Sequence, residues 1–145
     1  MGKFGAAVAA WSKEKELAVQ QAFVGATLEL VEEIRRPLGQ GGNMPVDTGY
    51  LRESLDASYS STPSTAPSDG PPKVGLSLKV EALIRRVNLG QKIYFGFTAT
   101  YAARQNYGFQ GMDSWGRVYN MAGHHFVELG IQRWPEIVKK HQGTT

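Results

Sequence analysis

Few residues of this chain have the type and spacing that chemistry requires, and its three histidines are the first candidates. His124 and His125 are adjacent, so on a helix their side chains would point about 100° apart. A helical zinc site instead uses two histidines four residues apart on one face. His141 lies far from both in the sequence. The histidines therefore indicate surface or interface side chains, and we predict no metal site.

Asp47 is the carboxylate that stands out, because it lies in a turn-forming PVDTG segment. General acid–base catalysis needs a second group held nearby, and Glu53 is the nearest residue that could serve. Capping of a short helix by Asp47 or Thr48 explains these residues more simply. The sequence also lacks a P-loop, a GxGxxG after a strand and a GxSxG motif. We therefore predict no catalytic residue and no cofactor, and expect the protein not to be an enzyme.

Basic residues that could face DNA lie in the second half of the chain. They are Arg85, Arg86, Lys92 and Arg104. Tyr94 and Tyr101 are interleaved with them, which is typical of non-specific nucleic-acid binding. The formal charge is only +3, and acids alternate with bases in KEKE and EEIRR, which indicates a solvated mixed surface. No helix-turn-helix, zinc finger or RNP pattern is present, so base-specific recognition is not expected.

A long N-terminal helix is the first element that would position these residues. Residues 3–36 contain no proline and many good helix formers, so we predict one helix over 1–36, about 50 Å long. Two apolar stripes follow helical spacing; they consist of Val19, Phe23, Ala26, Leu30 and Ile34, and of Phe4, Val8 and Trp11. A helix this long exceeds so small a domain, so its N-terminal half should project toward another subunit. The alternative is a break near Ser12 that folds the chain back.

The middle of the chain predicts a turn, a short helix and a loop. Pro37 ends the long helix, and a glycine-rich connector follows. In the short helix after Asp47, Leu51 and Leu55 are four residues apart and should face the core. Residues 61–73, STPSTAPSDGPPK, are too rich in proline, serine and glycine to bury apolar area, and predict an exposed, mobile loop.

Strand patterns lie on both sides of that loop. A strand could begin at residues 58–61, and residues 91–100 alternate, with Ile93, Phe95 and Phe97 on one face. Residues 74–88 are ambiguous, because GLSLKV alternates like a strand whereas VEALIRRV has helical spacing. For them we predict a strand followed by a short helix.

The C-terminal third predicts one helical turn over residues 101–108, closed by Gly108. Residues 109–123 contain several glycines and predict a loop or hairpin. Residues 124–141 predict a terminal helix with a kink or restart at Pro135.

The composition is that of one globular domain, because 41% of the 145 residues are apolar and 20% are charged. No apolar run is long enough to span a bilayer and no signal peptide is evident, so we expect synthesis in the cytoplasm and no membrane partner. Without cysteine there are no disulfides or thiolate metal ligands. Stability that a small core lacks must then come from packing or from oligomeric neighbours.

Three motifs, in this order, resemble the tail-component family of lambdoid and related long-tailed bacteriophages, which are tail-completion or neck proteins. The segment PVDTGYLRESL, residues 45–55, is similar to the family's PVDTGxLxxS signature; its matching residues are Pro45, Asp47, Thr48, Gly49, Leu51 and Leu55. The strand at 93–97 followed by Tyr101, and then Tyr107-Gly108, resembles the second signature. Phe126, at the start of the terminal helix, resembles the third.

The resemblance spans residues 10–140, with three departures from the family. Asn106 stands where the family has an acidic residue, His125 stands where it has a proline, and residues 61–73 resemble an insertion. These departures bear on the position within the neck more than on the class of protein.

The resemblance implies an α+β subunit, in which a long N-terminal helix and a C-terminal helix pack on a small antiparallel β-sheet. It also implies a homo-oligomeric ring, expected to be a hexamer, in the virion neck between head and tail. The implied partners are head-connector and tail-tube or tail-terminator proteins, with non-specific contact to packaged DNA. A tail-terminator ring is the alternative within this class, and a small non-specific nucleic-acid-binding protein is the alternative from another class.

Overall fold

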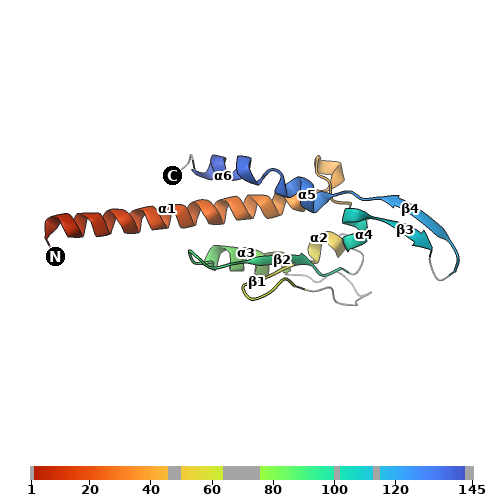
Figure 1. Ribbon diagram of the computed structural model, residues 1–145, viewed down its shortest axis with the longest axis horizontal. Helices are drawn as coiled ribbons and strands as arrows, with labels where there is room; N and C mark the ends of the chain where they lie inside the picture. The colour runs from red at the N-terminus through yellow and green to blue at the C-terminus, as the bar shows by residue number, and fades with distance from the viewer. Residues whose placement is uncertain (1, 46–49, 64–75, 100–101, 113–114, 143–145) are drawn as a thin grey trace.

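The protein is elongated, with a projecting element at each end of a central body (Figure 1). The computed structural model describes residues 2–45, 50–63, 76–99, 102–112 and 115–142. Helix α1 (Lys3–Ile34) projects from one end of the body through its N-terminal half. The hairpin of β3 (Gly108–Met112) and β4 (Val118–Ala122) projects from the other end. The predicted α+β fold, with a long N-terminal helix, a C-terminal helix and a small antiparallel sheet, is confirmed.

Helix α1 is continuous from Lys3 to Ile34, so the alternative with a break near Ser12 is wrong. It ends two residues before the predicted Arg36. The reason is Pro37, which disfavours helical backbone in the residue before it. A short 3-10 turn, η1 (Leu38–Gln40), then leads into the connector.

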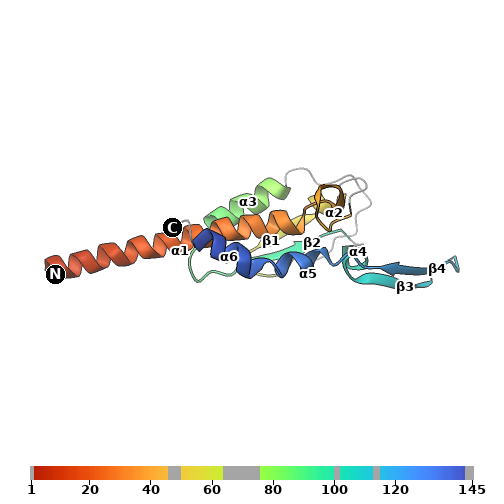
Figure 2. The ribbon, with the colours of Figure 1, turned by 90° about the horizontal axis from the view of Figure 1, so that it is seen from above.

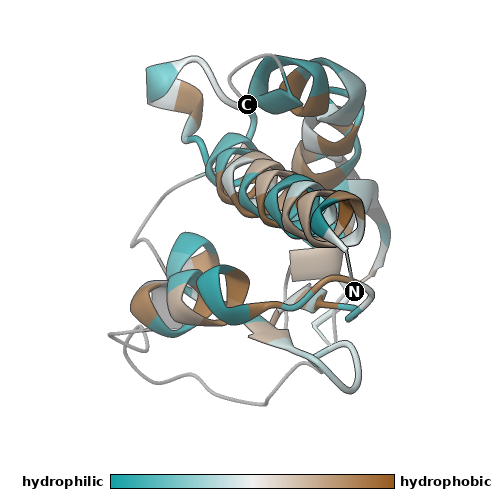
Figure 3. Ribbon diagram, turned by 90° about the vertical axis from the view of Figure 1, so that its left-hand side faces the viewer, coloured by the Kyte–Doolittle hydropathy of each residue, from teal (hydrophilic) through white to brown (hydrophobic). Residues whose placement is uncertain are grey.

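The body has three layers, with α1 in the middle. Viewed along α1 from its N-terminus, α5 and α6 lie on one side of it, and α3 with β1 and β2 lies on the other (Figure 3). Strand β1 (Leu55–Ser58) pairs antiparallel with β2 (Tyr94–Phe97), Leu55 opposite Phe97. Helix α3 (Leu76–Arg86) packs on β1 and α1. A core cluster joins these elements; it consists of Val31, Leu55, Ala57, Val80 and Ile84.

Two strand predictions are wrong in this region. The GLSLKV segment was expected to be a strand, but its described part belongs to α3. Val80, Ile84 and Val87 are all buried at helical spacing, so burial of this face decides between the two patterns. The second wrong prediction is the strand that was expected to begin at residues 58–61. The strand in this region, β1, begins earlier, at Leu55, and ends at Ser58.

The short motif helix is α2 (Tyr50–Glu53), and it ends before Leu55. The Ser54 hydroxyl and backbone N–H both donate to the Leu51 carbonyl, at 2.8 and 3.1 Å, so Ser54 closes the helix and turns the chain into β1. Leu51 and Leu55 are therefore not on one helix as predicted. Both are nevertheless buried, in two different core clusters.

The second core cluster lies where the connector, α4 (Ala102–Tyr107) and α5 (Phe126–Ile131) meet. Its buried members are Met44, Leu51, Ala99, Ala102 and Phe126. The rings of Phe97 and Phe126 pack edge to face with centroids 5.4 Å apart, which ties this cluster to β2.

The C-terminal segment forms two helices, α5 and α6 (Trp134–Gln142), that run along α1 (Figures 1 and 2). The predicted restart near Pro135 is confirmed, since Pro135 is the second residue of α6, where a missing N–H costs little. His124, expected inside the helix, precedes it. The predicted turn closed by Gly108 is also confirmed, because α4 ends there and Gly108 has φ +88°.

Of the two alternatives for residues 109–123, the hairpin is confirmed, because β3 and β4 pair antiparallel with Met112 opposite Val118. Most of the predicted loop at 61–73 lies outside the described residues.

Candidate assembly surfaces

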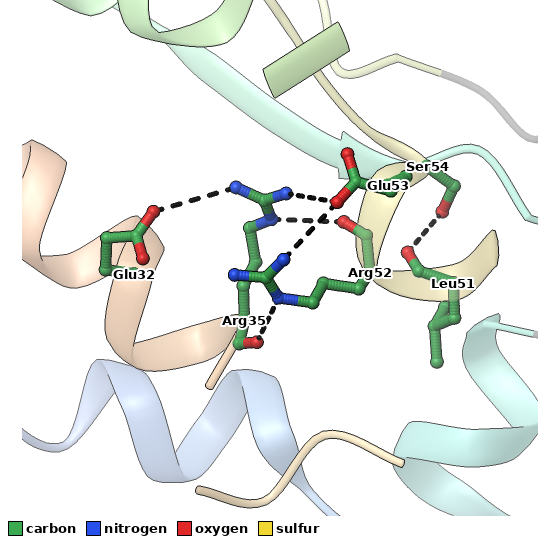
Figure 4. Close-up of polar contacts among 6 residues, drawn as sticks. All are labelled: Glu32, Arg35, Leu51, Arg52, Glu53 and Ser54. Carbon is green, nitrogen blue, oxygen red and sulfur yellow. Dashed lines mark hydrogen bonds and ion pairs between the residues drawn. The ribbon is translucent and has the colours of Figure 1, made fainter. Parts of the chain in front are cut away.

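The first motif is fastened to the end of α1 by a reciprocal arginine pair (Figure 4). Arg35 Nε donates to the Arg52 carbonyl at 3.0 Å, and Arg52 Nε donates to the Arg35 carbonyl at 3.1 Å. Glu53 Oε1 accepts from both guanidinium groups, at 3.4 and 3.3 Å. We call Arg35, Arg52 and Glu53 the arginine clamp. It ties the C-terminal end of α1 to α2.

Arg35 is only 5% exposed, so the prediction of a solvated surface for EEIRR is wrong at this residue. Burial lowers the pKa of Arg35, and the nearby Arg52 charge acts in the same direction, whereas Glu53 and Glu32 oppose the shift. An arginine nevertheless remains charged in the physiological range. The clamp is therefore a permanent structural contact and not an acid–base device.

The other motif residues differ in exposure, and some of them lie outside the described residues. Asp47, Thr48, Gly49 and Tyr101 lie outside the described residues, so the predicted cap is not tested. Pro45 is half-buried, Phe126 is buried and Tyr107 is 66% exposed.

Asn106 joins the second and third motifs, a contact that the sequence did not predict. Its Oδ1 accepts from the Val127 N–H at 3.1 Å, and its Nδ2 donates to Glu128 Oε1 at 2.9 Å. The buried amide thus satisfies a donor at the start of α5. His125 beside it has φ +50°, which a proline could not adopt, so this turn departs from what the resemblance implies.

The four basic candidates do not form one patch. Arg85 and Arg86 lie exposed in the last turn of α3, and Lys92 is exposed in the following connection. Arg104 is on α4, beyond the opposite end of β2. Arg85 also pairs with Glu81 at 3.0 Å.

The projecting N-terminal half of α1, residues 3–17, is here called the arm. Its predicted apolar stripe is exposed: Phe4 by 83%, Val8 by 47% and Trp11 by 60%. The predicted burial of Val19 is wrong, since that side chain is 58% exposed. Further along α1, Phe23 packs edge to face on Trp134. No described residue covers this apolar stripe of the arm.

Ion pairs hold α5 and α6 to the C-terminal half of α1. Lys140 Nζ lies 2.7 Å from Glu29 Oε1, and Arg133 Nη1 lies 2.8 Å from Glu33 Oε2. The hydrogen bond from Lys140 lowers the pKa of Glu29, and the bond to Glu33 raises the pKa of Arg133. Between Glu29 and the arm, Phe23 of α1 still contacts Trp134 of α6.

An apolar groove of about 410 Å³ opens between α1, β2, α4 and α5. Leu30, Ile34, Phe95, Ala103, Val127 and Ile131 are among its lining residues. Ile131 is 51% exposed and Tyr107 stands at the same groove. We call it the α1–α5 groove.

The hairpin exposes a second set of apolar side chains, namely Met112, Trp115 and Val118. The Arg117 guanidinium lies 5.1 Å from the centre of the Trp115 ring, a cation–π distance.

The described residues contain no group of three histidines or carboxylates placed to hold a metal ion. Within the same residues, no helix has the length and apolar character needed to cross a membrane. Comparisons of the chain with protein-family models, with curated proteins and with solved structures found no match.

Proposed function

We propose that this chain is a structural protein of a tailed bacteriophage, a neck or tail-completion subunit that forms a ring joining the DNA-filled head to the tail. The sequence resemblance at residues 45–55, 93–108 and 125–127 suggests the class. The observation that carries the proposal is the arm, a rigid helix that presents Phe4, Val8 and Trp11 to solvent.

An uncovered apolar face on a projecting helix supports an assembly role. Soluble monomers rarely expose contiguous apolar surface without a partner for it. A ring needs two different surfaces on each subunit, because an isologous contact closes only a pair. The arm is one such surface, and the hairpin at the opposite end of the molecule is available to a neighbour outside the ring (Figure 1).

The packing of the C-terminal half of α1 on α3, α5 and α6 suits this role, because the arm is a direct continuation of that half. A neighbour that grips the arm then sets the orientation of the whole subunit. The hairpin, with Trp115 exposed, offers a separate apolar surface for the adjoining head-connector or tail ring. In this proposal the protein works by assembly in the virion neck, and the ring has sixfold symmetry like the tail.

Native mass spectrometry of the purified chain tests the proposal. The chain is measured alone, with tail tubes and with DNA-filled heads, at two salt concentrations. Binding to tubes or heads, with or without a ring in isolation, supports the neck function.

Two variants separate this function from non-specific nucleic-acid binding. Trp11→Ala should reduce particle binding, whereas Arg86→Ala should leave it unchanged. A chain that ignores both particles, but binds DNA with an affinity that falls steeply with salt and depends on Arg86, would belong to the other class.

A further inference from the structure

The α1–α5 groove is an apolar acceptor that the described residues leave open. Leu30 and Ile34 of α1, Phe95 of β2, and Val127 and Ile131 of α5 face it. The side-chain amide of Asn106, which also lines the groove, is hydrogen-bonded to Val127 and Glu128. The groove therefore favours an apolar occupant with no charge to neutralise.

Its volume matches more than one large side chain. A dry apolar cavity of about 150 Å³ accommodates a benzene molecule, whereas this groove measures about 410 Å³. Two neighbouring apolar side chains from one turn or two of a helix would fit such a space. Trp11 and Val8 of the arm are a pair of that kind, three residues apart on one face.

The arm cannot reach the groove of its own molecule. Trp11 and Leu30 belong to one continuous helix, and a rise of 1.5 Å per residue separates them by about 28 Å. The arm also points away from the body (Figure 2). Only the arm of another copy can bring this stripe to the groove.

We infer that the α1–α5 groove binds the apolar stripe of the arm of a second copy of this chain, with Trp11 as the anchor. This contact is heterologous, so repeating it builds a ring when the rotation between neighbours closes, and every arm and every groove is then occupied. The inference rests on the proposed function, since it specifies the contact that closes the proposed ring.

The absence of native cysteine allows this contact to be mapped by cross-linking. Ala103 is exposed at the groove, and Ala7 lies beside the stripe on the arm. Ala7→Cys and Ala103→Cys chains are mixed and treated with a short bismaleimide, both as the isolated oligomer and bound to heads or tails. Cross-linked pairs of one chain of each kind are expected, and the double variant should give a ladder that ends at the ring's copy number.

Ala6→Cys is the matched control, because Ala6 lies on the face of the arm roughly opposite the stripe. It should lose most of the cross-linking to Ala103→Cys. Equal cross-linking of both arm variants would contradict the inference. Cross-linking of Ala7→Cys chains only to each other would also contradict the inference, because it indicates two arms side by side. A chain that is monomeric both alone and on particles would contradict it as well.

A second pair of variants tests the groove without cysteine. Ile131→Arg places a charge in the groove and should abolish the oligomer while the unfolding midpoint is retained. Leu129→Arg, on the same helix but outside the groove lining, should leave the oligomer intact. Retention of the oligomer in Ile131→Arg would indicate that the groove is empty or takes a small apolar molecule.

The two proposals fail in different ways. Particle binding by the unmodified chain, without a cross-link between Ala7→Cys and Ala103→Cys, leaves the neck function standing and overturns the arm–groove contact. The cross-link in a chain that binds neither particle supports the contact and overturns the neck function.

Discussion

The two halves of α1 form one helix but are stabilised differently. The C-terminal half is the middle layer of the body, with Ala26 and Val31 buried and ion pairs to α6 at Glu29. The arm meets no described residue that covers its apolar stripe. Helix propensity sets the length of α1, because no proline occurs before Pro37, whereas the body covers only half of it. Substitutions in the body should therefore change folding, and substitutions in the arm should change assembly.

The largest effect on stability is expected for Phe126→Ala. Phe126 is 1% exposed and packs on Phe97, so its truncation leaves a cavity in the second core cluster. We expect a loss of about 3–5 kcal/mol in the free energy of unfolding, measured in urea. A loss below about 1 kcal/mol would mean that this cluster is not a core.

The next largest effect is expected for Arg35→Ala, which breaks the arginine clamp. Arg52 loses the partner of its carbonyl, and Glu53 loses one of its two guanidinium partners, so we expect a loss of about 2–3 kcal/mol. Arg85→Ala, which removes the exposed pair with Glu81, is the control and should cost less than about 1 kcal/mol. Similar losses in both variants would contradict the assignment of a structural role to the clamp.

A smaller, pH-dependent effect is expected at Glu29. Its pKa is lowered by Lys140, so the carboxylate stabilises the fold above its unfolded pKa of about 4.3, and this contribution is lost as the pH falls through the folded value. Glu29→Gln should cost about 0.5 kcal/mol at pH 7. Urea unfolding at a pH below the folded pKa should show no difference between the variant and the parent chain.

The smallest change in unfolding free energy is expected for Trp11→Ala, within about 0.5 kcal/mol. Trp11 is 60% exposed and lies in the arm, so little packing is lost in the monomer. Assembly should nevertheless be lost. Urea unfolding of Trp11→Ala and of Phe126→Ala, each as a monomer, compares the two effects on stability. A loss of more than about 2 kcal/mol of unfolding free energy in Trp11→Ala would mean that the arm packs on the body.

Most of the helical architecture could be predicted from local sequence. The absence of proline gave the length of α1, glycine gave the end of α4, and Pro135 gave the restart at α6. GLSLKV was predicted wrongly because alternation and helical spacing overlap there, and burial of Val80 and Ile84 against β1 and α1 decides the outcome.

The candidate surfaces were predictable only in part. The stripe of Phe4, Val8 and Trp11 follows from helical spacing, and its projection follows from the length of the helix. The arginine clamp could not be predicted, because Arg35 lies in a charged run that is typical of a solvated surface. The groove and the amide contacts of Asn106 depend on segments far apart in the sequence, which only the fold brings together.

The most direct test of the proposed assembly through the arm compares the unmodified chain with Trp11→Ala by native mass spectrometry in the presence of tail tubes and DNA-filled heads. We expect the unmodified chain to bind one of these particles in a defined copy number, and Trp11→Ala to remain monomeric and unbound. An unmodified chain that stays monomeric and binds neither particle would contradict this proposal.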